Sequence, residues 1–199
     1  MGAIARACAE RRIDATVVTV ISDREDAPGL RTARELGLEA VVVPFRSFAD
    51  RTAFERELQA TLAAQSPDLI ALAGFMRILS PQLVRAWEGR MLNIHPSLLP
   101  RHRGLDTHRR VLAAGETDHG ASVHFVTPEL DAGPVVLQSR LTVRPGESAE
   151  ALSARVQATE HIIYPRTIGL ISEGRLAWRD GHPVLDGRAL AAPLVEDFE

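Results

Sequence analysis

The sequence predicts an α/β protein built on an open, mostly parallel, twisted sheet with helices on both faces and an antiparallel C-terminal portion. This prediction rests on two observations. In the first half of the chain, short apolar runs rich in β-branched residues alternate with longer amphipathic segments, the order that right-handed crossovers and a parallel sheet require. In the second half, only a short loop separates two such runs, so these two strands are expected to pair antiparallel.

The expected strands share short length, apolar character and turn-forming residues at their ends. They are 15–21, 40–44, 69–73, 91–95, 121–126 and 135–143, followed by a hairpin of 175–178 and 183–185 around Asp180-Gly181. The last ten residues are expected to form an ordered or fraying tail.

The expected helices are bounded by residues that cap helices or stop them. They run over 3–12, from Pro28 to a stop at Gly37, from a cap at Asp50 past Leu62, from a cap at Ser80 to Trp87, over 104–114, and from a cap at Ser148 to Gly169 or Ser172 with a kink at Pro165.

Length and charge limit the class of protein. With 199 residues, we expect a single domain over 1–199, consisting of an N-terminal half, 1–95, and a C-terminal half, 96–199. The formal net charge of −3 gives no electrostatic reason to expect nucleic acid or an anionic membrane as a partner. All 23 basic residues are Arg, so Schiff-base and P-loop lysine mechanisms are excluded.

The sequence also favours a cytoplasmic location. The single cysteine, Cys8, cannot form an internal disulfide, which is typical of a reducing compartment. No apolar run approaches the roughly 20 residues that span a bilayer, and no signal-peptide pattern opens the chain.

The segment Asn93-Ile94-His95-Pro96-Ser97-Leu98-Leu99-Pro100 follows the expected strand and leaves it through a turn fixed by two prolines. Ligands of open α/β sheets bind at such strand ends. Asn93 can donate to a developing oxyanion, and His95 can move a proton near neutral pH, so the pair suits acyl transfer. A histidine in a turn is more often a hydrogen-bonded structural residue, and this alternative stays open.

A second candidate is the loop 129–134, in which Gly133 and Pro134 fix an irregular backbone around Asp131. An Asp beside His95 would orient the imidazole and favour its protonated form. An Asp that caps its own turn is equally compatible with this sequence.

Three separated segments, 92–100, 74–79 and 120–136, together resemble the phosphoribosylglycinamide formyltransferase family, the folate-dependent enzymes of purine synthesis. Glu160-His161 followed by Tyr164-Pro165 agrees with the same family, and the resemblance covers about residues 1–190. It implies the Rossmann-like formyltransferase fold, with nucleotide binding in the half 1–95 and folate binding in the half 96–199.

The resemblance also implies an activity. In this family the amine of glycinamide ribonucleotide, N1-(5-phosphoribosyl)glycinamide, attacks the formyl carbon of the co-substrate 10-formyltetrahydrofolate, a step of de novo purine (IMP) biosynthesis. Asn93, His95 and Asp131 match the catalytic trio. His95 as imidazolium and Asn93 would donate to the oxyanion, and Asp131 would hold His95 charged and help to relay the proton.

Ligand contacts follow from the same resemblance. Folate contacts are implied for Arg51, Met76, Arg77, Ile78, Leu79, Asn93, Val126 and Leu130. Gln157 and Glu160 lie with Tyr164 on one helix face, and both are expected to bind the ribonucleotide, Glu160 through its ammonium or ribose end. Spacing alone would make Arg51 and Glu160 solvated helix residues. The seven histidines form no pair of the HExxH kind with a carboxylate, so no metal is expected.

The sequence departs from the family at its start. Members begin with a strand and a Gly-Ser-Asn-rich loop that cradles the ribonucleotide phosphate, whereas this sequence starts inside the following helix. We therefore expect that about a dozen residues are missing, through a mis-assigned start or a truncation. A natural short form that binds folate but holds the phosphate poorly is the alternative.

Two relatives share the catalytic trio and remain as alternatives. Formyltetrahydrofolate deformylase normally carries an extra N-terminal regulatory domain, and methionyl-tRNA formyltransferase carries a C-terminal nucleic-acid-binding domain and a basic surface. An inactive folate-binding truncated form is the non-enzyme alternative.

Overall fold

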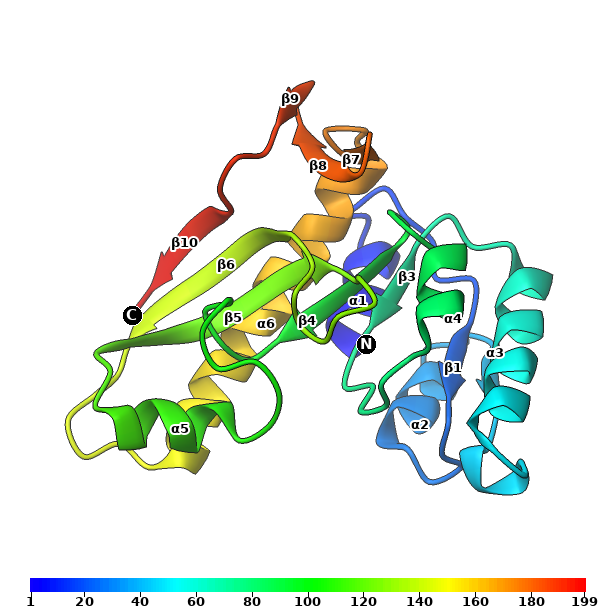
Figure 1. Cartoon of the computed structure of the whole chain (residues 1–199), viewed down its shortest axis with the longest axis horizontal. Helices are drawn as coiled ribbons and strands as arrows, with labels where there is room; N and C mark the ends of the chain where they lie inside the picture. The colour runs from blue at the N-terminus through cyan, green and yellow to red at the C-terminus, as the bar shows by residue number, and fades with distance from the viewer. The chain divides into compact units, whose positions relative to one another are not determined.

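The computed structural model describes all 199 residues, and the chain divides into two compact units, Met1–Ile70 and Ala71–Glu199 (Figure 1). The single domain with halves at residue 95 stays a prediction. The predicted α/β class is confirmed, with parallel strands in the first unit and a sheet of both parallel and antiparallel pairs in the second.

The first unit holds a parallel two-stranded sheet, and two of its α-helices begin at the predicted residues, Pro28 and Arg51. The unit comprises α1 (Gly2–Ala9), β1 (Val20–Ser22), α2 (Pro28–Glu35), β2 (Ala40–Val42), the 3₁₀ helix η1 (Phe45–Ser47) and α3 (Arg51–Gln65). Asp50 caps α3 by accepting a hydrogen bond from the Ala53 amide. Helix α2 packs against both strands and buries Leu30 and Ala33.

The predicted strand 15–21 is wrong over most of its length. Only Val20–Ser22 pairs with a neighbouring strand, and Val18 is 47% exposed. β-Branched residues favour extended backbone, but a strand exists only where a second strand takes up its backbone hydrogen bonds. The first helix also ends three residues earlier than predicted, and Arg11 then has a left-handed φ of 55°.

The second unit is built on a five-stranded sheet in the order β10-β6-β5-β4-β3 (Figure 1). Its strands are β3 (Ile70–Leu72, which begins at the unit boundary), β4 (Met91–His95), β5 (Asp118–Phe125), β6 (Val135–Thr142) and β10 (Leu194–Phe198). β4, β5 and β6 pair antiparallel, which confirms the predicted pairing of the two strands in the second half.

Helices and a small second sheet complete this unit. They are α4 (Pro81–Ala86), α5 (Thr107–Ala114), α6 (Ala149–Ser172) and the three-stranded sheet of β7 (Leu176–Arg179), β8 (His182–Leu185) and β9 (Arg188–Ala189). Helix α6 packs along β5 and β6, and its residues Leu152, Val156 and Ile163 are fully buried. The core therefore lies between α6 and one face of the sheet, which leaves the residues of the opposite face available for a site.

Local predictions in this unit are mostly confirmed. Ser80 and Ser148 cap α4 and α6, and the hairpin turns at Asp180 and Gly181, both with positive φ. Helix α6 runs through Pro165 to Ser172. Helix α5 begins at Thr107 rather than 104, because Gly104 and Asp106 are left-handed and cannot belong to a right-handed helix.

The predicted C-terminal tail is instead a strand. β10 pairs in parallel with β6, from Leu194 opposite Leu137 to Phe198 opposite Leu141. Its side chains alternate between half-buried and exposed positions, the two-residue period of a strand at the edge of a sheet.

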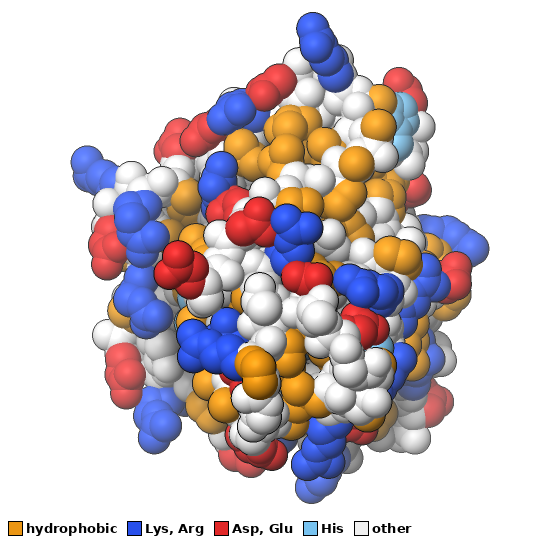
Figure 2. Space-filling model, turned by 90° about the vertical axis from the view of Figure 1, so that its left-hand side faces the viewer, with side chains coloured by type: hydrophobic (Ala, Val, Ile, Leu, Met, Phe, Trp, Pro, Cys, Tyr) orange, Lys and Arg blue, Asp and Glu red, His pale blue; other side chains and the backbone are white.

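The nearly balanced numbers of acidic and basic residues in the sequence are reflected at the surface. Figure 2 shows acidic and basic side chains interspersed with hydrophobic ones over the viewed face, without one large field of a single sign. None of the helices combines the length and apolar character that crossing a membrane requires.

Candidate active site

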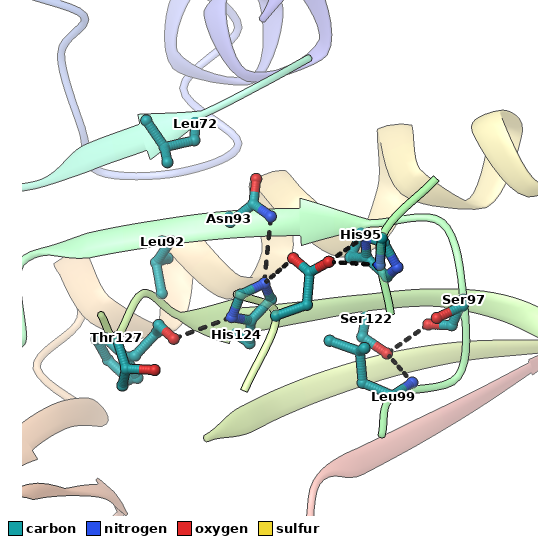
Figure 3. Close-up of polar contacts among 12 residues, drawn as sticks. Leu72, Leu92, Asn93, His95, Ser97, Leu99, Ser122, His124 and Thr127 are labelled. Atoms are coloured by element: carbon teal, nitrogen blue, oxygen red, sulfur yellow. Dashed lines mark hydrogen bonds and ion pairs between the residues drawn. The ribbon is translucent and has the colours of Figure 1, made fainter. Parts of the chain in front are cut away.

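Strand β4 presents Asn93 and His95 on one face of the sheet, because residues two apart in a strand point the same way. In the register of β4 with β5, Asn93 lies opposite His124 and His95 opposite Ser122. Figure 3 shows Asn93 and His95 along the strand with His124 beside them. The predicted pair therefore has a second imidazole next to it.

His95 is buried, with 6% of its surface exposed, and an acceptor faces each ring nitrogen. Its Nδ1 lies 3.4 Å from Oδ2 of Asp131, and its Nε2 lies 3.0 Å from the His102 carbonyl oxygen. An imidazolium carries an N–H on both nitrogens. Both ring nitrogens of His95 therefore face oxygen atoms that accept hydrogen bonds.

Asp131 reaches His95 from the loop between β5 and β6. Its φ of 49° is left-handed, a conformation that Asp tolerates better than most residues, and its Oδ2 accepts a hydrogen bond from the Gly104 amide at 2.9 Å. A Cβ at Gly133 would lie 1.8 Å from the Phe125 carbonyl oxygen, so only glycine allows the loop to pass this close to β5. Of the two interpretations left open for Asp131, the structure agrees with a carboxylate beside His95.

His124 orients the amide of Asn93. Its Nδ1 lies 2.9 Å from the Phe125 carbonyl oxygen, which can only accept, so Nδ1 carries the hydrogen. Nε2 is then the acceptor for Asn93 Nδ2 at 3.2 Å. Burial lowers the pKa of His124, which keeps the ring neutral and able to accept. Sequence reasoning did not assign this role to His124, although the two-residue alternation of β5 could have indicated it.

The residues predicted to line the folate pocket lie in two loops of the same unit. Met76, Arg77, Ile78 and Leu79 lie between β3 and α4, with Met76 and Ile78 74% and 59% exposed and Leu79 buried. Val126 and Leu130 belong to the loop that carries Asp131, and Leu130 is 49% exposed. Large apolar side chains that are this exposed fit surfaces that a ligand covers.

The predicted ribonucleotide contacts lie on α6, with Gln157 exposed and Glu160 half-buried. Burial raises the pKa of Glu160 to about 7. One turn further, the Tyr164 hydroxyl lies 2.9 Å from the Leu72 carbonyl oxygen and 3.1 Å from that of Leu92, so it joins α6 to β3 and β4.

Arg51 is the one predicted contact that belongs to the first unit. It begins α3 and its Nε lies 2.8 Å from the Glu55 carboxylate. The structure thus gives Arg51 an ion-pair partner one turn away on its own helix.

Two further histidines are paired with each other. His108 Nδ1 lies 3.0 Å from His119 Nε2, and burial together with the neighbouring His108 lowers the pKa of His119 to about 4. No group of three or more His, Cys, Asp or Glu side chains is arranged to hold a metal ion.

Known proteins are similar to this chain over most of its length. The sequence profile of the formyl transferase family matches residues 1–168. The chain is 47% identical to the phosphoribosylglycinamide formyltransferase of Escherichia coli K12, over 94% of this chain and 89% of that protein.

Solved structures give the same result. The phosphoribosylglycinamide formyltransferase of Coxiella burnetii, solved in complex with CHES, superposes with a TM-score of 0.91 at 45% identity, over 97% of this chain and 92% of that one. A formyltetrahydrofolate deformylase of Pseudomonas syringae is more distant, with 27% identity and a TM-score of 0.83 over 92% of this chain and 60% of that one. The chain therefore belongs to the formyl transferase family, within the group of phosphoribosylglycinamide formyltransferases.

Proposed function

We propose that this chain transfers the formyl group of 10-formyltetrahydrofolate to the amine of N1-(5-phosphoribosyl)glycinamide, and that Asn93, His95 and Asp131 carry out the transfer. The observation that supports this assignment most is the placement of His95 between the Asp131 carboxylate and a backbone carbonyl, two residues after an oriented amide. Acyl transfer needs such donors, held in place where negative charge develops.

The transfer step follows from these donors. The neutral amine attacks the formyl carbon, and the carbonyl oxygen becomes an oxyanion. The Nε2–H of protonated His95 is the donor for that oxyanion, in a hydrogen bond shared with the His102 carbonyl oxygen that lies 3.0 Å from Nε2. The second N–H of Asn93 adds another hydrogen bond, since its first is held by His124.

Proton transfer completes the reaction. The attacking nitrogen loses a proton as the bond to N10 of the folate breaks, and N10 leaves as a neutral amine after it gains one. Asp131, 3.4 Å from His95 Nδ1, keeps the imidazolium in place and helps to relay this proton.

Binding of the two substrates is assigned to the other residues that the family resemblance implies. The exposed apolar side chains of Met76 and Ile78, with Arg77, Leu79, Val126 and Leu130, take the folate, and Arg51 offers a cation to an anionic ligand. Gln157 and Glu160 take the ribonucleotide, whose ammonium suits the carboxylate of Glu160.

Small molecules are thus the proposed partners, and the net charge of −3 supports them over nucleic acid. The lone Cys8 supports a cytoplasmic location.

The decisive experiment measures formyl loss from 10-formyltetrahydrofolate with and without the ribonucleotide. Loss that depends on the ribonucleotide, together with formation of the N-formyl product, is the expected result. Loss at the same rate without it would assign the chain to the deformylases, and folate binding without any loss would make it an inactive folate-binding form.

A further inference from the structure

A row of three buried side chains crosses the sheet on the face of the site. His95 of β4 lies opposite Ser122 of β5, and Ser122 lies opposite Gln138 of β6. Their exposed fractions are 6%, 0% and 9%. Neither Ser122 nor Gln138 enters the transfer step described above.

Ser122 and Gln138 bind the turn that follows His95. The Gln138 amide nitrogen donates to the Leu99 carbonyl oxygen at 2.9 Å and to Ser122 Oγ at 2.8 Å. Ser122 Oγ donates to the Ser97 carbonyl oxygen at 2.6 Å and accepts from the Leu99 amide at 3.0 Å. Figure 3 shows the contacts of Ser122 with Ser97 and Leu99.

The hydrogen-bonding capacity of these groups fixes the directions of the bonds. A hydroxyl has one hydrogen and two lone pairs, so Ser122 donates once and accepts twice, and its capacity is fully used. The Leu99 carbonyl can only accept, so the nitrogen rather than the oxygen of the Gln138 amide must face it. The arrangement therefore has one orientation, and removal of either side chain leaves buried backbone groups unpaired.

The same turn ends at an acceptor of His95. Ser97 Oγ donates to the Arg101 carbonyl oxygen at 2.7 Å, and the next carbonyl, that of His102, lies 3.0 Å from His95 Nε2. The position of this acceptor thus depends on the segment 97–102, which Ser122 and Gln138 hold at its start.

We propose that Gln138, acting through Ser122 and the turn 97–102, is a positioning residue that holds the His95 ring in the orientation needed for transfer. This inference rests on the proposed function of His95. Gln138 touches no reacting atom, and its effect is on the rate of the step rather than on the affinity for either substrate. Displacement of a catalytic group by about 1 Å can cost a factor of 100 in rate, so a loosened turn is expected to have a measurable effect.

The chain offers a matched control in the adjacent residue of β6. Ser139 is also fully buried but points to the opposite face, where its Oγ accepts from the Ala121 amide at 3.1 Å and contacts Thr159 Oγ1 at 2.7 Å. Ser139→Ala removes buried hydrogen bonds next to α6 and leaves the turn intact. It therefore reports the effect of lost stability alone.

The test compares Gln138→Met, which keeps the volume and removes the donors, with Ser139→Ala, at a temperature where both are folded by circular dichroism. We expect Gln138→Met to lower kcat by roughly tenfold or more, with little change in KM for either substrate, and Ser139→Ala to leave kcat within about twofold of the wild type. Equal kcat values for the wild type and Gln138→Met, or equal losses in both variants, would overturn the proposal.

A double-mutant cycle distinguishes an effect of Gln138 that passes through His95 from a general effect of Gln138 on the structure. In the His95→Ala background, Gln138→Met should lower the residual rate by less than about twofold, because its effect passes through His95. The same factor in both backgrounds would contradict the proposal. If Gln138→Met fails to fold, Ser122→Ala is tested in the same way. A wild-type rate in His95→Ala alone would instead refute the proposed function.

Discussion

His95 and His119 are both almost completely buried, at 6% and 1% exposure, yet their surroundings are opposite. His95 has a carboxylate at Nδ1 and a carbonyl at Nε2, two groups that accept hydrogen bonds. The nitrogen nearest to His119 Nε2 is that of another imidazole, and the two rings meet edge to face with centroids 5.1 Å apart. Two neutral rings can share one hydrogen bond, but two protonated rings cannot.

The comparison teaches that burial alone does not decide what a histidine can do. Burial disfavours a charged ring, and hydrogen-bond acceptors at the ring nitrogens offset this cost. At His119 the neighbour of Nε2 is a second imidazole, and burial lowers the pKa of His119 to about 4. We therefore expect substitution of His95 to affect turnover and substitution of His119 to affect the pH dependence of stability.

The largest expected effect is on turnover in His95→Ala. Loss of an oxyanion donor typically costs about 10²–10³ in rate, and we expect this range for kcat in His95→Ala and also in Asn93→Ala, with both variants folded. Steady-state kinetics with both substrates is the measurement. Near-normal kcat in either variant would remove that residue from the transfer step.

Asp131→Asn tests whether transfer needs the negative charge beside His95, because this substitution keeps the conformation of the loop. Asn tolerates a left-handed φ such as the 49° found here and its side-chain oxygen can still accept from Gly104, so the fold should persist. Without the negative charge beside Nδ1, the imidazolium loses its partner, and kcat should fall by about 10-fold to 100-fold. A loss of folding in parallel with the loss of rate would show that the carboxylate is needed for the loop itself.

His119 should make stability depend on pH. Its pKa is about 4 in the folded chain, below the ordinary value near 6.5, so the unfolded chain binds the proton first. The free energy of unfolding should therefore fall as the pH drops from about 6.5 to 4, by up to about 3 kcal/mol for the full shift.

Urea unfolding of His119→Phe across this pH range is the measurement, and the variant should lose much of the dependence. His182→Asn, a change in the exposed hairpin, is the matched control and should keep it. If both variants retain the dependence of the wild type, other groups cause it.

The smallest effect is expected from Ser148→Ala, which removes the cap of α6. Ser148 accepts a hydrogen bond from the Ala151 amide, and loss of such a cap costs about 1 kcal/mol of stability. Thermal unfolding should detect this change while kcat stays at the wild-type value. A drop in kcat would mean that α6 transmits small shifts to the site.

Much of the second unit could be predicted from the sequence because its signals are local. The limits of β4 and the caps at Ser80 and Ser148 depend on residues within one or two turns of each other. Asn93 and His95 could be placed on one face from the strand period alone. The failures have a non-local cause: β10 exists because β6 offers it an edge, and 15–19 is not a strand because no neighbour pairs with it.

The residues of the candidate site also differ in whether local sequence signals or distant contacts determine them. Asp131 could be named as a candidate, but its position 3.4 Å from His95 could not be predicted from the sequence. Ser122 and Gln138 carry no sequence signal, since their partners lie 16 to 39 residues away along the chain and the β5–β6 register shifts between Val123 and His124.

The left-handed backbone at Asp131 has a consequence for how this position can evolve. Residues with a larger or branched side chain are strained at such a φ, whereas Gly and Asn fit it readily. Neither Gly nor Asn carries a negative charge, and the acidic alternative, Glu, is longer and less suited to this conformation. Two requirements therefore limit the residue at position 131. The backbone conformation favours a few small residues, and the contact with the imidazole favours an acid. Asp is the one amino acid that meets both requirements.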